Sequence, residues 1–162
     1  MKFEKFVKSL ASTGTIYERT NGDRWLASPT VFMLIPANTK SITGVAILPM
    51  PENIEKMIYQ LGHTDDAKLV QAVMPFPDGG IKDCLRVFET ADAIRCVISN
   101  DDWSLIERSD MTRIKYSYDL DQNKNVAKAL LVSIYPQVPD DEDELVGIIF
   151  PDYTEFGGNY NG

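Results

Sequence analysis

Apolar side chains recur with helical spacing in two stretches of the chain. The first set lies near the start: Phe3, Phe6, Val7 and Leu10. The second set follows Pro51: Ile54, Met57, Ile58 and Leu61. Because positions i, i+3, i+4 and i+7 lie on one face of an α-helix, both sets predict amphipathic helices. Gly14 and Gly62 follow as residues that readily end a helix, and Pro51 suits a first helical turn.

A β-hairpin is predicted around the dipeptide Asn21-Gly22. Both residues tolerate the positive φ of a type I′ turn, and β-prone residues flank them on each side. A two-residue turn at this dipeptide places Tyr17 opposite Leu26. A third strand over residues 31–35 then continues the meander.

Most of the remaining chain predicts strands joined by turns. Residues 64–76 leave two alternatives, because Thr64 and Asp65 suit the start of a helix whereas KLVQAVMPF suits a strand equally well. Further strands are predicted at residues 84–89, 94–99, 112–118, 127–135 and 145–150, with a short helix after Ser99 or Asn100.

The predicted elements define an α+β protein. About eight or nine strands, joined mainly by hairpins, and about three helices predict a mostly antiparallel sheet or sheets. Regular β–α–β alternation is missing, which argues against Rossmann-type and P-loop architectures. A chain of 162 residues suits one domain, so residues 1–155 are expected to form a single globular domain and residues 156–162 a flexible tail.

The two cysteines lie in neighbouring predicted strands. One arrangement that side-chain alternation allows has Leu85 and Val87 on the core face together with Ile94, Cys96 and Ile98. Cys84 then points to the opposite face, so the two thiols cannot form a disulfide. Two cysteines without a CxxC pair indicate a reducing, intracellular setting.

The chain also lacks the apolar segments of exported or membrane-inserted proteins. Its N-terminal segment mixes charged and apolar residues, unlike the continuous apolar core of a signal peptide. No apolar run approaches the roughly 20 residues that a membrane span requires. We therefore expect a cytoplasmic protein that does not associate with membranes.

Negative charge concentrates in the last third of the chain. The net charge is −8, yet residues 1–100 hold 11 acids and 11 bases, whereas residues 101–162 hold 13 acids and five bases. Beyond Lys128 there are seven acids and no base. This distribution predicts a region of negative potential and disfavours direct binding to nucleic acid.

No catalytic centre is predicted from the residues that commonly carry chemistry. His63 is the only histidine, and its place after a predicted helix suits contact with exposed carbonyls. Without a histidine or cysteine partner it does not indicate a zinc site. Phosphate-binding glycine loops and serine-nucleophile motifs do not occur. We expect no catalytic residue, no bound metal and no cofactor.

A divalent-cation site is the alternative that the sequence leaves open. Its candidate ligands are Asp101, Asp102, Asp119 and Asp121, in the manner of a hydrolase or nuclease. The segment DLDQNKN alternates Asp and Asn as a calcium loop does, but Leu130 stands where the closing glutamate is required. A hairpin turn is the preferred interpretation of this segment.

Five consecutive acids, residues 140–144, form the most distinctive polar segment. Three interpretations fit: a solvated loop between strands, a cation site, or a negative surface for a basic partner. The third interpretation predicts a partner-binding surface composed of Asp140, Asp141, Glu142, Asp143, Glu144, Asp152, Tyr153 and Glu155. Such a surface can steer association with a nucleic-acid-binding protein, or occupy its groove in place of DNA or RNA.

Three segments carry a family resemblance: KFEKFVKSLASTGTIYERTNGDRWLASPTVFMLIP, ISNDDWSLIERSD and LVGIIFP. They resemble small uncharacterised proteins encoded in prophages and other mobile elements of Gram-positive gut bacteria. The resemblance implies an accessory protein that binds and modulates host machinery, including defence nucleases. It assigns no functional residue.

The sequence thus predicts a non-catalytic acidic protein that binds a basic, nucleic-acid-handling host protein and modulates or inhibits it. Two other classes remain open. One is the divalent-metal-dependent hydrolase or nuclease described above. The other is a structural or assembly homo-oligomer that uses its sheet edges and its tyrosine-rich tail.

Overall fold

The computed structural model describes residues 1–10, 13–39, 42, 45–59, 63–74, 77–134 and 144–151. Its helices are α1 (Phe3–Leu10), α2 (Glu52–Tyr59) and α3 (Asn100–Trp103), with one 3-10 turn, η1 (Ile81–Asp83). Its strands are β1 (Thr15–Glu18), β2 (Arg24–Ala27), β3 (Val31–Leu34), β4 (Ala46–Pro49), β5 (Thr64–Val73), β6 (Leu85–Thr90), β7 (Arg95–Ser99), β8 (Met111–Asp119), β9 (Lys124–Ile134) and β10 (Glu144–Ile149). Within these ranges no helix is long and apolar enough to cross a membrane.

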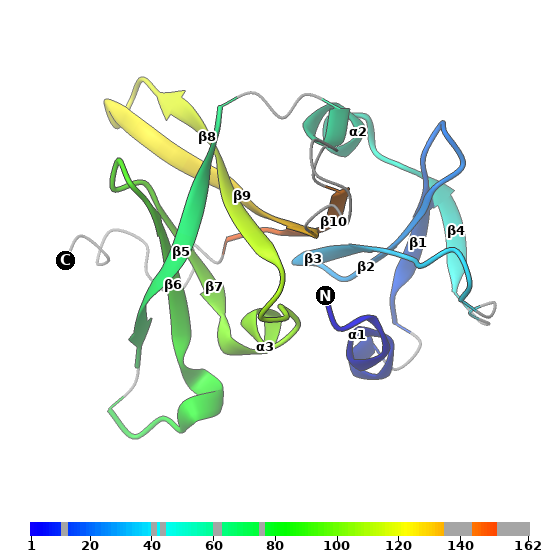
Figure 1. Cartoon of the computed structure of the whole chain (residues 1–162), viewed down its shortest axis with the longest axis horizontal. Helices are drawn as coiled ribbons and strands as arrows, with labels where there is room; N and C mark the ends of the chain where they lie inside the picture. Colours follow the sequence, from blue (N-terminus) through cyan, green and yellow to red (C-terminus); the bar gives the residue numbers. More distant parts are fainter. Residues whose placement is uncertain are drawn as a thin grey trace.

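The ten described strands form one sheet in the order β4-β1-β2-β3-β10-β9-β8-β5-β6-β7 (Figure 1). Every neighbouring pair is antiparallel except β1 and β4. This mostly antiparallel sheet and the three helices confirm the predicted α+β class. The last strand, β10, lies between β3 and β9, so it joins the N-terminal strands to the rest of the sheet.

Two helices cover opposite faces of the N-terminal part of the sheet. Phe6 of α1 belongs to the same buried cluster as Leu26 and Met33, whereas Ile54 of α2 belongs to a second cluster with Trp25. The adjacent β2 residues Trp25 and Leu26 therefore pack on opposite faces of the sheet. Strands buried on both faces have nearly continuous apolar sequences, as VFML in β3 and ALLV in β9 show.

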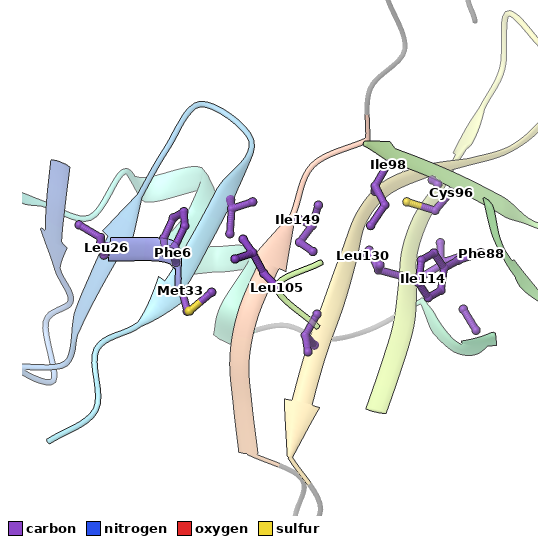
Figure 2. Close-up of a cluster of buried hydrophobic side chains, with 14 of the residues drawn as sticks. Phe6, Leu26, Met33, Phe88, Cys96, Ile98, Leu105, Ile114, Leu130 and Ile149 are labelled. Carbon is purple, nitrogen blue, oxygen red and sulfur yellow. The ribbon is translucent and has the colours of Figure 1, made fainter. Parts of the chain in front are cut away.

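The larger cluster includes residues from every described strand except the exposed edge strand β4. Figure 2 shows Phe6 and Met33 at one end of it, Phe88 and Cys96 at the other, and Ile149 of β10 between them. Side chains of α1 and of β7, the strand at the far edge, thus share one core. Strands β7 and β9 contact each other although three strands separate them in the sheet order, so this half of the sheet curls, as its right-handed twist favours.

The first hairpin has a different register from the predicted one. Tyr17 lies opposite Trp25, one residue away from its predicted partner. The loop holds three residues rather than two: the Arg19 N–H donates to the Asp23 carbonyl oxygen at 2.8 Å, and Gly22 adopts a φ of 92°. A three-residue loop with glycine in a left-handed conformation is a common alternative to the type I′ turn, and it shifts the pairing by one position.

The segment with two alternatives, residues 64–76, contains the strand β5, and β6 and β7 follow it as a hairpin. The predicted facing of this hairpin is wrong in part. Leu85 and Val87 pack with Val97 in a small cluster of their own, whereas Phe88 and Cys96 belong to the main core. Both faces of the hairpin carry apolar side chains, so alternation alone could not assign the inner face. Both cysteines are buried and free.

Candidate functional site

The predicted acidic surface adjoins β10. Of its eight residues the structure describes Glu144; Asp140, Asp141, Glu142, Asp143, Asp152, Tyr153 and Glu155 lie outside the described residues. Glu144 is exposed and begins β10, where it pairs with Ile134, the last residue of β9. Both attachment points of residues 135–143 therefore lie at the same end of the β9–β10 pair.

The other acids of the predicted surface follow the opposite end of β10. Pro151 is the last described residue, and Asp152 comes directly after it. A β-strand advances by about 3.3 Å per residue, so Glu144 and Pro151 are separated by roughly 20 Å along the strand. The predicted surface combined both sets of acids, whereas these sets adjoin opposite ends of β10.

Several acids of the described part are engaged in ion pairs with basic side chains. These pairs are Arg19–Glu55 at 2.9 Å, Arg24–Glu18 at 3.1 Å, Lys56–Glu52 at 3.2 Å, Arg95–Glu89 at 2.6 Å and Arg113–Asp66 at 3.2 Å. The described part holds 18 of the 24 acids and 15 of the 16 bases, a net charge of −3. The remaining −5 of the net −8 belongs to the other residues.

The structure does not bring the four candidate metal ligands together. Asp101 and Asp102 lie in α3, whereas Asp119 and Asp121 lie at the turn between β8 and β9. Asp119 Oδ1 accepts the backbone N–H groups of Asp121 at 2.9 Å and Gln122 at 3.3 Å, so it stabilises the turn. Across the described ranges, no three His, Cys, Asp or Glu side chains are close enough to hold a metal ion.

Four titratable residues outside the acidic segment, His63, Lys115, Tyr116 and Cys96, have surroundings typical of structural side chains. His63 is exposed in a left-handed conformation with a φ of 58°, and its ring centroid lies 6.1 Å from that of Tyr116. The pKa of Tyr116 is raised, mainly by desolvation and to a smaller extent by a hydrogen bond with Asp65. Burial lowers the pKa of Lys115 and raises the pKa of Cys96 to about 12. A thiol with so high a pKa carries almost no thiolate at neutral pH, which makes it a poor nucleophile.

Strand β5 has an exposed edge that was not predicted from the sequence. Only Thr64, Asp65 and Asp66 of β5 pair with β8, and this pairing ends at Arg113, two residues after the start of β8 at Met111. The Thr112 hydroxyl still donates to the Ala67 carbonyl oxygen at 2.6 Å. Beyond that point, β6 is the one described strand that pairs with β5.

Apolar side chains cover this edge, hereafter the β5 edge (residues 68–74). Leu69, Val70 and Met74 are 41%, 53% and 47% exposed. The pairing with β6 steps from Leu69 to Gln71, so Val70 is the unpaired residue of a β-bulge. In the sequence KLVQAVM, apolar residues occur on both faces of the strand. This pattern could have indicated an exposed apolar edge, but a strand that is buried on both faces has the same pattern.

No protein-family model matches the chain, and no curated protein or solved structure matches it significantly. A function for this chain therefore has to follow from its own side chains and their surroundings. Two features of the chain indicate a binding function: the acidic segments attached to β10 and the apolar β5 edge.

Proposed function

We propose that this chain is a non-catalytic acidic binding protein whose partner is a basic protein that handles nucleic acid. One observation carries the proposal. The two segments adjoining β10, residues 135–143 and 152–162, contain six acids and no base, and the exposed Glu144 adds a seventh acid. In the described part, by contrast, acids and bases nearly balance and many form ion pairs.

The spacing of these acids suits imitation of a nucleic-acid strand. An extended chain advances by about 3.3–3.6 Å per residue. One strand of duplex DNA carries a charge for about every 3.4 Å of its axis. Consecutive acids in an extended chain therefore carry a charge per unit length similar to that of one DNA strand, with alternate carboxylates on opposite sides of the chain. Charge of this kind steers association over a Debye length of about 8 Å at physiological salt, and it repels nucleic acid itself.

The proposal includes a cellular setting. We place the protein in the cytoplasm, as an accessory protein of a prophage or another mobile element that modulates or inhibits its target. The free buried thiols of Cys84 and Cys96 suit a reducing compartment. The resemblance of three sequence segments to proteins of mobile elements supplies the context.

Charge-neutralised variants test the acidic segment directly. One variant replaces the acidic run: Asp140→Asn, Asp141→Asn, Glu142→Gln, Asp143→Asn and Glu144→Gln. The control removes the same number of charges elsewhere: Glu4→Gln, Glu52→Gln, Asp78→Asn, Asp92→Asn and Asp121→Asn. A partner captured from host lysate is purified, and its affinity for each variant is measured between about 50 and 300 mM salt.

We expect the first variant to bind at least about tenfold more weakly and with a flatter salt dependence, because fewer screened charges contribute. The control should retain most of the affinity, and the wild-type protein should displace DNA from the partner. Equal losses in both variants, or no loss in the first, would remove the acidic run from the proposal. Thermal stabilisation by millimolar Mg²⁺, Mn²⁺ or Ca²⁺ would instead favour the hydrolase or nuclease class.

Self-assembly through the β5 edge is a second candidate function, favoured by the exposure of Leu69, Val70 and Met74. The edge contains one charged residue, Lys68, on a chain of net charge −8, so two copies meet the least repulsion there. Antiparallel pairing of two identical edges gives a closed two-fold dimer. An exposed apolar edge is otherwise a site of uncontrolled association.

Analytical ultracentrifugation at several protein concentrations tests this second candidate. Val70→Lys should prevent association, because it places a charge at the centre of the shared edge. Leu120→Lys is the matched control, since Leu120 is 84% exposed in the β8–β9 turn. A wild-type protein that stays monomeric at about 100 μM, where micromolar association would be evident, would rule out assembly through this edge.

A further inference from the structure

A groove of about 1140 Å³ runs beside α1, on the face of the sheet opposite α2. Its apolar lining is formed by Phe3, Val7, Leu10, Leu26, Ile42 and Val45. Most of these side chains are half-buried: they pack against the main core on one side and line the groove on the other. The volume is large enough for a ligand with a long apolar portion.

Three lysines of α1 line the same groove: Lys2, Lys5 and Lys8. Within the described residues none of them takes part in an ion pair, whereas four arginines do. Two acids, Glu4 and Glu107, also line the groove, so the charged side chains that line it comprise three lysines and two carboxylates. The rim therefore presents a local excess of positive charge on a protein of net charge −8.

We propose that this groove binds an amphipathic carboxylate, with its alkyl chain along the apolar lining and its carboxylate at the lysine rim. An alkyl chain gains binding free energy with each methylene group that it removes from water. A carboxylate on a lysine forms a charge-assisted hydrogen bond, which a neutral head group cannot provide. The site does not involve β10, so it is independent of the proposed function.

Isothermal titration of the full chain with dodecanoate, below its micellar concentration, tests the proposal. We expect one saturable site that binds dodecanoate at least about tenfold more tightly than dodecanol, since the two ligands share the same chain and differ in head-group charge. Equal affinity for the acid and the alcohol would overturn the role of the lysines. The absence of saturable binding below about 1 mM would overturn the site itself.

Charge-matched variants assign the binding to this groove. Lys5→Glu combined with Lys8→Glu should weaken dodecanoate binding by about tenfold or more, because it reverses the rim. Lys82→Glu combined with Lys128→Glu is the control, since it changes the net charge equally at exposed positions on η1 and β9. An equal loss in both variants would show a general charge effect and overturn the assignment.

A groove-filling variant provides a test that leaves the lysines in place. Asn38 is exposed and lines the groove, so Asn38→Trp adds a large side chain without disturbing the core. We expect this variant to fold with an unchanged melting temperature and to lose dodecanoate binding. Retained binding, in a variant that circular dichroism shows to be folded, would place the ligand elsewhere and overturn the proposal.

Discussion

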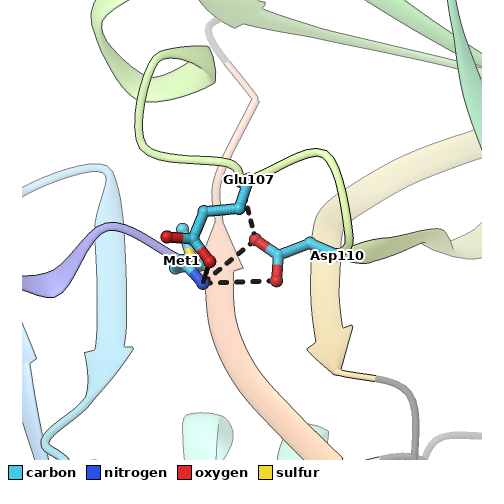
Figure 3. A network of polar contacts seen from close by, with 3 residues as sticks. All are labelled: Met1, Glu107 and Asp110. Atoms are coloured by element: carbon cyan, nitrogen blue, oxygen red, sulfur yellow. Dashed lines mark hydrogen bonds and ion pairs between the residues drawn. The ribbon is translucent and has the colours of Figure 1, made fainter.

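The amino group of Met1 lies 3.0 Å from a carboxylate oxygen of Asp110, and both side chains are almost fully buried, at 1% and 0% exposed (Figure 3). The second Asp110 oxygen accepts from the same amino group at 3.2 Å. Met1 leads into α1, and Asp110 immediately precedes β8. The contact therefore ties the N-terminal helix to the strands of the other half of the sheet.

Asp110→Asn should destabilise the fold strongly. The substitution keeps the shape of the side chain but removes the buried counter-charge of the Met1 ammonium, which is left with the half-exposed Glu107 carboxylate 3.8 Å away. Removing one partner of a buried ion pair costs about 3 kcal/mol or more. Chemical denaturation at neutral pH measures the change in the free energy of unfolding. Glu107→Gln is the control: Glu107 is 49% exposed and 3.8 Å away, so a change below about 1 kcal/mol is expected.

Gly147→Ala should also destabilise the fold, for steric reasons. A Cβ atom at Gly147 would collide with Sδ of Met1, and its distance to Cε of Met1 would be 3.1 Å. The Met1 side chain is only 1% exposed, so the surrounding core leaves it little space to withdraw. Overpacking of this kind costs about 1–3 kcal/mol. Gly80→Ala, where the nearest atom is 3.9 Å away, should change the stability by less than about 0.5 kcal/mol.

Alkaline pH should destabilise the protein through Cys96. Burial raises the pKa of its thiol from 9.0 to about 12, so between these values the unfolded chain holds fewer protons than the folded protein. The contribution of the neutral thiol to the free energy of unfolding is therefore fully present below pH 9 and is lost as the pH rises toward 12. At pH 10.5 the loss relative to pH 8 should be about 2 kcal/mol.

Cys96→Ala separates this effect from other groups that titrate at high pH. Urea denaturation of both proteins at the two pH values gives the comparison. The variant should be less stable at pH 8 because it leaves a cavity, but its further loss on going to pH 10.5 should be about 2 kcal/mol smaller than that of the wild type. Parallel losses in the two proteins would contradict the assignment to Cys96.

Gly22→Ala should weaken the first hairpin without changing its register. Gly22 has a φ of 92°, a conformation that costs an alanine about 1 kcal/mol or more. Nothing lies within 4 Å of a Cβ atom at this position, so the cost is conformational rather than steric. Thermal denaturation should show a lower melting temperature, and amide exchange should show faster opening near Arg19 and Asp23. An unchanged melting temperature would contradict the conformational explanation.

Local pattern was sufficient for most of the individual elements. The helical stripes that contain Phe6 and Ile54 predicted α1 and α2. Apolar runs separated by turn residues predicted the positions of the later strands along the chain. These features depend on side chains a few residues apart, whose relative placement is set by the period of the helix or strand. The concentration of acids near the end of the chain is likewise a property of the sequence alone.

Tertiary structure decided how the elements combine. The insertion of β10 between β3 and β9, the ion pair of Met1 with Asp110, and the groove beside α1 join residues that are far apart in the chain. The facing of Leu85 and the exposure of Val70 were also undetermined, because both alternating sets of side chains in their strands are apolar. A strand with two apolar faces does not specify its partner or its covered side, so the packing of the whole sheet makes that choice.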